Sequence, residues 1–139
     1  MKKKLSISIF VMVAIIIVIW FRSPVDIINI DSNEVREISI FDSNTGNSLK
    51  TFDKEDITYI IANLNKIKLK REKLSSGYTG DSFKVTIYGN DGEEIDGWNN
   101  FVIISEDRIQ KDQFFYKVVE DKIDFQYIRN LMEETENIT

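Results

Sequence analysis

Hydrophobic residues divide the chain into one long apolar run and a series of shorter segments in which apolar and polar residues alternate. Three lysines at residues 2–4 precede 17 residues without a charge, residues 5–21. As a helix, this run would span roughly 25 Å, the short end of what crosses the hydrocarbon core of a bilayer. A buried helix of a soluble protein is the alternative, but the rest of the chain is too small to surround one. The pattern therefore predicts a transmembrane helix within residues 1–22.

The end of the apolar run favours a retained anchor over a cleaved signal peptide. Signal peptidase sites need small side chains, whereas residues 18–21 are Val, Ile, Trp and Phe. Trp20 also suits the headgroup layer of a membrane. Since residues 2–4 are all lysine and only Arg22 follows the run, the N terminus is expected in the cytoplasm and the remainder outside. The sequence thus predicts a single-pass protein of the cell membrane, with residues 1–22 as the cytoplasmic lysines and the anchor.

After the anchor, the sequence predicts a tether at residues 23–33, where Pro24 ends the helix, and an extracytoplasmic domain at residues 34–139. The alternating residues 35–42 and the following segment flank a turn at Gly46, which predicts a β-hairpin. Asp53 is placed as the N-cap of a helix. The apolar face of this helix is expected to consist of Ile57, Ile60, Ile61 and Leu64.

The second half of the domain repeats this order with more strands. Residues 83–88 and 94–105 flank a strong hairpin turn of sequence Asn-Asp-Gly. Residues 113–119 predict a further strand, with a short one at residues 109–110 before it. Asp124 then begins a second helix. The sequence therefore predicts an α+β domain, in which an antiparallel sheet and two helices follow the order ββα-βββ(β)α.

Charge and missing residue types exclude several classes of function. Without residues 1–22, the chain has 14 Lys and Arg against 23 Asp and Glu, a net charge of −9. Such a domain is a poor nucleic-acid binder, because neutralising phosphates supplies most of that affinity. The chain also has neither cysteine nor histidine. Disulfides, Cys/His zinc sites and Ser-His-Asp catalysis are therefore excluded, and no metal, cofactor or catalytic residue is predicted.

The order of elements resembles a family of small Firmicutes proteins of unknown function. The resemblance covers roughly residues 35–135, and it rests on the Thr-Gly of the first turn, on residues 55–70 (EDITYIIANLNKIKLK) and on residues 114–134 (FFYKVVEDKIDFQYIRNLMEE). It implies a signal-like segment or lipoprotein start followed by one α+β domain in a Gram-positive bacterium. It carries over no catalytic residue, and the chain departs from the lipoprotein members because it lacks their cysteine.

One basic segment stands out in the otherwise acidic domain. Its five cations lie within residues 66–73, and they are Lys66, Lys68, Lys70, Arg71 and Lys73. The functional interpretation is a contact site for an anionic partner, such as phospholipid headgroups or cell-wall polyanions. The alternative is the solvated side of a strand that follows a helix. The alternative is favoured, because runs of charge usually mark a solvated face.

Residues 75–82 form a long polar loop with Tyr78 at its middle. Long loops on rigid scaffolds often carry function, and Tyr78 could form an aromatic ligand platform with Trp98. Trp98, however, lies in a strand pattern, which favours a position in the core. Tyr78 is therefore retained as a candidate loop contact.

The sequence favours a non-enzymatic, membrane-tethered domain that binds a protein or an envelope component, as an accessory or sensing module. The alternative is a carboxylate-dependent hydrolase of cell-wall material, in which Asp and Glu do the chemistry without histidine. A concave site with two facing carboxylates at the separation found in glycosidases would favour the hydrolase. A flat or convex acidic surface would favour the binding module.

Overall fold

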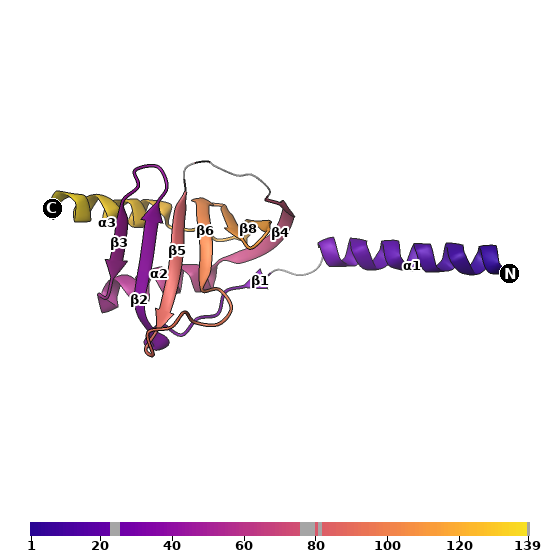
Figure 1. Cartoon of the computed structure of the whole chain (residues 1–139), viewed down its shortest axis with the longest axis horizontal. Helices are drawn as coiled ribbons and strands as arrows, with labels where there is room; N and C mark the ends of the chain where they lie inside the picture. Colours follow the sequence, from indigo (N-terminus) through magenta and orange to yellow (C-terminus); the bar gives the residue numbers. More distant parts are fainter. Residues whose placement is uncertain (23–25, 76–79, 81, 139) are drawn as a thin grey trace.

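The structure is a computed structural model, and it describes residues 1–22, 26–75, 80 and 82–138. Helix α1 (Lys2–Arg22) projects from a small domain built on one antiparallel sheet with two further helices, α2 (Lys54–Lys66) and α3 (Phe125–Ile138) (Figure 1). A 3₁₀ turn, η1 (Ser32–Glu34), precedes the first long strand. The predicted α+β class, with an N-terminal apolar helix and an antiparallel sheet with two helices, is confirmed.

The described residues form eight strands in one sheet, each antiparallel to its neighbours. In chain order they are β1 (Asp26–Ile27), β2 (Val35–Asp42), β3 (Ser48–Thr51), β4 (Lys68–Leu74), β5 (Phe83–Gly89), β6 (Asn100–Ser105), β7 (Arg108–Lys111) and β8 (Phe114–Glu120). Their order in space is β1-β4-β8-β7-β6-β5-β2-β3. The predicted order is thus extended by β1 and by β4, which contains most of the basic segment. The strand expected from residue 94 begins only at Asn100, after Gly97 has turned the chain with a φ of +81°.

Both helices pack on the same face of the sheet, and the hydrophobic core lies between them and the strands (Figure 1). Alternate residues of the central strands point into this core, as Ile38 and Ile40 do in β2. The predicted apolar face of α2 is confirmed, since all four of its residues are buried: Ile57, Ile60, Ile61 and Leu64. The opposite, outer face of the sheet carries the alternate side chains, and neither α2 nor α3 covers it (Figure 1).

The beginnings of the two helices are joined by a crossed pair of tyrosine hydrogen bonds. Asp53 and Asp124 are N-caps as predicted: the Asp53 carboxylate accepts two hydrogen bonds from backbone N–H groups of the first turn, and the Asp124 carboxylate accepts one. The Tyr59 hydroxyl of α2 donates to Asp124 at 2.5 Å, and the Tyr127 hydroxyl of α3 donates to Asp56 at 2.7 Å. The two rings stack with their centroids 4.1 Å apart. Burial and the Asp56 carboxylate raise the pKa of Tyr127, so this donor keeps its proton further into the alkaline range than an ordinary tyrosine.

The prediction of a tether at residues 23–33 is wrong for its described part, residues 26–33. Strand β1 pairs with β4, opposite Leu69. Ile28 is fully buried, and the backbone of Ile30 exchanges two hydrogen bonds with the Asn65 side chain of α2, at 3.0 and 2.8 Å. A two-residue strand is too short to show a periodic pattern, which is why the sequence did not reveal it. The packed domain therefore includes the chain from Asp26 onward.

Candidate functional site

The basic segment lies at one side edge of the sheet. Lys66 is the last residue of α2, and the other four cations belong to β4. Strand β8 pairs with the whole inner edge of β4, but β1 pairs only with Lys68 and Leu69 on the outer edge. Within the described part of the chain, no strand covers the outer edge of β4 from Lys70 to Leu74. The alternative predicted for this segment, a strand that follows a helix, is thus what the structure contains.

The five predicted cations do not form one surface, because the side chains of β4 project to opposite faces of the sheet. Lys68 is neutralised by Glu120, whose carboxylate lies 2.7 Å from its ammonium group. Arg71 points to the face of the sheet that holds the core, where it donates a hydrogen bond to the Tyr116 hydroxyl at 3.2 Å. Lys70 and Lys73 are exposed and lie on the outer face, as their strand partners show.

Two cations that the sequence interpretation missed, Lys117 of β8 and Arg108 of β7, complete a row on the outer face. Lys70 of β4 lies directly opposite Lys117, and Lys117 lies directly opposite Arg108 of β7. Residues directly opposite in an antiparallel pair project on the same side of the sheet, so three like charges stand side by side. Lys73 lies next to this row, with its ammonium group 5.9 Å from the Phe115 ring centre. We call Lys70, Lys73, Arg108 and Lys117 the cationic face.

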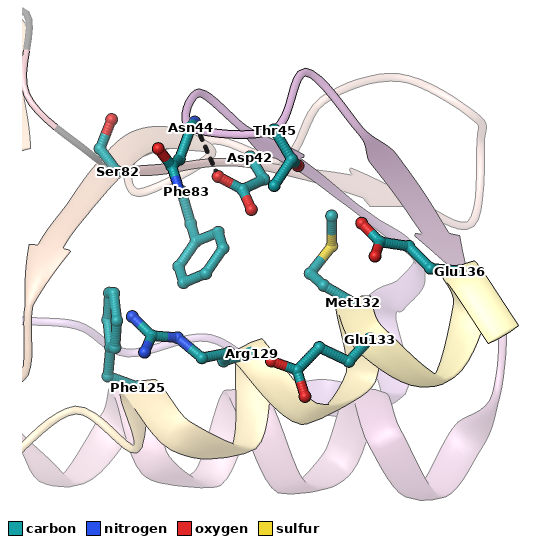
Figure 2. Close-up of a pocket in the computed structure, with 10 residues that line it drawn as sticks. All are labelled: Asp42, Asn44, Thr45, Ser82, Phe83, Phe125, Arg129, Met132, Glu133 and Glu136. Carbon is teal, nitrogen blue, oxygen red and sulfur yellow. Dashed lines mark hydrogen bonds between the residues drawn. The ribbon is translucent and has the colours of Figure 1, made fainter.

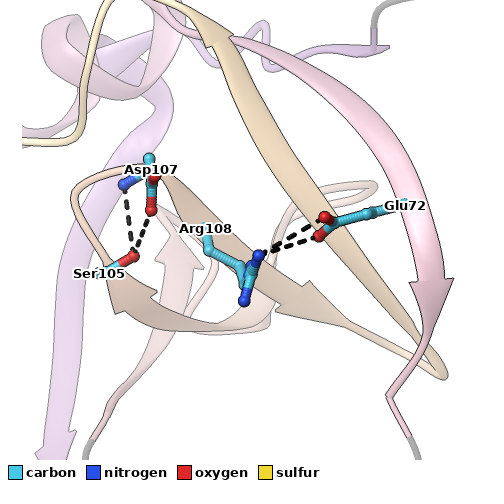
Figure 3. Close-up of polar contacts among 4 residues, drawn as sticks. All are labelled: Glu72, Ser105, Asp107 and Arg108. Atoms are coloured by element: carbon cyan, nitrogen blue, oxygen red, sulfur yellow. Dashed lines mark hydrogen bonds and ion pairs between the residues drawn. The ribbon is translucent and has the colours of Figure 1, made fainter.

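One carboxylate partly compensates the cationic face. Glu72 sits at a bulge of β4, and its carboxylate lies 3.3 Å from the guanidinium of Arg108, two strands away (Figure 3). Asp107, in the turn before β7, is bound within that turn, because its carboxylate accepts a hydrogen bond from the Ser105 hydroxyl at 2.7 Å (Figure 3). Among the described residues, no carboxylate contacts Lys70 or Lys117. The cationic face therefore keeps an excess positive charge in a domain that is otherwise acidic.

The last turn of α1 contacts the same edge of the sheet from the side of the core. The Arg71 guanidinium lies 4.3 Å from the ring centre of Phe114 and 4.6 Å from that of Trp20. The rings of Trp20 and Phe114 are arranged edge to face, with their centres 6.2 Å apart. Helix α1 is long and apolar enough to cross a membrane, and its segment from Lys2 to Trp20 is not buried against the domain.

A polar cleft lies at the opposite side of the domain, between the turn after β2, the start of β5, and α3 (Figure 2). Its volume is about 420 Å³. Phe83 and Met132 supply apolar surface, and the Arg129 guanidinium lies 5.1 Å from the ring centre of Phe125 (Figure 2). Asp42, the last residue of β2, and Glu133 of α3 line the cleft from different elements (Figure 2). The cleft therefore brings carboxylates from two elements to one concave surface, which is one part of what the hydrolase alternative requires.

Asp42 is fixed within its turn, because its carboxylate accepts a hydrogen bond from the backbone N–H of Asn44 at 2.8 Å. The carboxylate of Glu136, near the end of α3, accepts a hydrogen bond from the Asn47 side chain. The cleft is therefore closed on one side by contacts between the first hairpin and the last helix. In the part of the chain that the structure describes, no group of three or more Asp, Glu, His or Cys side chains is arranged to hold a metal ion.

The candidate aromatic platform is described only in part, because Tyr78 lies outside the described residues. Trp98 packs edge to face against Phe101 and Tyr116, with centre-to-centre distances of 6.0 and 5.3 Å. It is partly buried at the margin of the core. The expectation that Trp98 belongs to the core is thus confirmed, although the residue lies in a bend before β6 and not in a strand.

Comparison with protein-family models, with curated proteins and with solved structures found no match in any of the three. The resemblance to a family of small Firmicutes proteins therefore stays a prediction.

Proposed function

We propose that this protein is a membrane-anchored, extracytoplasmic binding module whose cationic face contacts an anionic component of the cell envelope. The row of Lys70, Lys117 and Arg108 on three adjacent strands carries this proposal. Like charges directly opposite each other in a sheet are destabilising. An anionic partner reduces this repulsion, so the row stabilises the bound state of the domain relative to the free state. Helix α1 supports the anchor, and the lysines at residues 2–4 support the orientation.

The negative charge of the rest of the domain orients the domain on its anionic partner. Residues 23–139 carry a net charge of −9, so an anionic partner is repelled by most of the domain and attracted at the cationic face. Each lysine near an anionic surface contributes about 1 kcal/mol, and the attraction falls off within a Debye length of roughly 8 Å at physiological salt. The proposed binding is therefore weak, oriented and sensitive to salt.

Exchanging Lys70 and Lys117 together for Gln is expected to weaken binding of a soluble polyanion by about 30-fold at low salt, since two contributions of about 1 kcal/mol are lost. The measurement is a titration of the full chain, held in nanodiscs of neutral lipid, with inorganic polyphosphate at low and physiological salt. The matched control exchanges Lys54 and Lys66 for Gln, which changes the net charge equally at exposed positions of α2, on the opposite face of the sheet. Equal losses in both variants, or no binding by the wild type at low salt, would contradict the proposal.

The polar cleft favours a second candidate, a carboxylate-dependent hydrolase of cell-wall material. Glycoside hydrolysis uses two carboxyl groups that flank the scissile bond, and Asp42 and Glu133 both line the cleft (Figure 2). Asp42 is held by the Asn44 backbone, so Asp42→Asn keeps the turn while it removes the charge.

If the cleft is catalytic, Asp42→Asn and Glu133→Gln are each expected to lower the release of soluble fragments from purified peptidoglycan by about 100-fold or more. The measurement uses the full chain in detergent, with Glu94→Gln as the control, because Glu94 is exposed and lines a different depression. Fragment release that is unchanged in both cleft variants, or no release by the wild type, would leave only the binding module.

A further inference from the structure

The contact between α1 and the sheet fixes which edge of the domain lies nearest to the end of the apolar helix. Arg71 of β4 lies between the rings of Trp20 and Phe114, 4.6 and 4.3 Å from their centres. Guanidinium groups stack favourably on aromatic faces, so this arrangement links the helix to the strand. A tryptophan that ends a membrane span lies at the level of the headgroups. Arg71, in direct contact with it, then lies at the same depth.

The uncovered edge of β4 carries side chains that suit this depth. Lys70 and Lys73 are exposed, and their long apolar stems allow the ammonium groups to reach phosphates while the stems lie against lipid. Leu74 at the end of the strand is 65% exposed, which gives this edge an apolar tip. Lysines on an edge strand also prevent pairing with other chains. That role does not account for the exposed leucine or for the stack of Arg71 on Trp20.

We propose that the uncovered edge of β4 lies on the anionic headgroup layer of the same bilayer that α1 crosses. Lys70 and Lys73 contact the lipid phosphates, and Leu74 lies at the boundary with the acyl chains. This inference rests on the proposed function, and it names phospholipid as the anionic partner. Because α1 anchors the domain in the bilayer and ends beside β4, lipid is present at the cationic face at a high effective concentration.

The distribution of charge over the rest of the domain agrees with this orientation. In Figure 1, α1 leaves the domain on the side of β4, whereas the end of α3 lies on the opposite side. The cleft carboxylates Glu133 and Glu136 belong to this distal part of α3. Docking through β4 therefore keeps them away from anionic lipid and leaves the cleft open to the aqueous side.

The test uses a single fluorescent reporter, which is straightforward because the chain has no cysteine. Leu74→Cys is labelled with an environment-sensitive dye, and Glu134→Cys on the exposed side of α3 is the matched control. The full chain is placed in nanodiscs of phosphatidylcholine, or of an equal mixture of phosphatidylcholine and phosphatidylglycerol. The readouts are the emission maximum and quenching by a lipid whose headgroup carries the quencher.

In the anionic nanodiscs, the dye at position 74 is expected to shift to shorter wavelength and to be quenched several-fold more than the dye at position 134. Exchanging Lys70 and Lys73 for Gln is expected to return the quenching at position 74 to its value in neutral lipid. Equal quenching at positions 74 and 134 in anionic lipid would overturn the inference. Equal quenching at position 74 in neutral and anionic lipid would also overturn it, since headgroup charge would then have no role.

Failure of this inference can be told apart from failure of the proposed function. Polyphosphate titration in neutral nanodiscs reports on the cationic face without any anionic lipid. If polyphosphate binds through Lys70 and Lys117 but position 74 stays in water, the binding module stands and the membrane-docked orientation is wrong.

Discussion

A soluble chain that begins at Asp31 is expected to be less stable than one that begins at residue 23, by about 3–6 kcal/mol. The shorter chain lacks Ile28 and Ile30, which are 0% and 8% exposed. Burial of an isoleucine side chain contributes about 1.5–3 kcal/mol, so two of them account for this range. The deletion also leaves the Asn65 side chain without the backbone of Ile30, with which it exchanges two hydrogen bonds. The measurement is urea unfolding of both chains under identical conditions.

Two neighbouring residues supply the matched control for this prediction. Ile28 is fully buried, whereas Ile27 is 58% exposed in the adjacent position. In the longer chain, Ile28→Ala is expected to lower the free energy of unfolding by about 2–5 kcal/mol, and Ile27→Ala by less than about 1 kcal/mol. Equal stability of the two chains, together with a negligible effect of Ile28→Ala, would show that residues 26–30 are a tether after all.

Replacing Phe101 by Ala is expected to lower the free energy of unfolding by about 3–5 kcal/mol. Phe101 lies in β6 near the middle of the sheet and is 1% exposed, so the variant would leave a cavity that the surrounding strands cannot close. Its ring also supports Trp98, whose ring centre lies 6.0 Å away. We therefore expect the near-ultraviolet circular dichroism of the folded variant to change as well.

The control for Phe101 is Phe52→Ala, which removes the same side chain where it is 58% exposed. Its cost is expected to stay below about 1 kcal/mol, because little apolar area returns to water. Urea unfolding at equilibrium compares the two variants with the parent chain. If Phe52→Ala were as destabilising as Phe101→Ala, the core would extend over the loop before α2, in disagreement with the packing described above.

Much of the local structure could be predicted because the interactions that specify it lie within a few residues. Asp53 and Asp124 cap helices through bonds to the next turn, and the buried face of α2 follows from its own spacing. The length and composition of α1 are likewise readable from one continuous run. The α+β class followed from these elements taken together.

The cationic face could be predicted only in part. Lys70 and Lys73 belong to the basic segment, but Arg108 and Lys117 lie in two other strands, β7 and β8. The alternation of residues around Lys117 shows only that it is exposed. Lys68 and Arg71 were also predicted to contact an anionic partner, but Lys68 pairs with Glu120 and Arg71 stacks on aromatic rings. A linear run of cations does not show such partners. Those partners come from strands that are remote in the sequence.

The sequence by itself determined both helices of the domain, most of its strands and its net negative charge, whereas the tertiary structure decided which strands are neighbours. Lys70 and Lys117 are brought together by the pairing of β4 with β8, and β1 joins that edge because Ile28 and Ile30 complete the core. A helix or a hairpin is specified by contacts between residues close in the chain. The choice between distant strands depends on how the whole core packs, and no local pattern of residues records that choice.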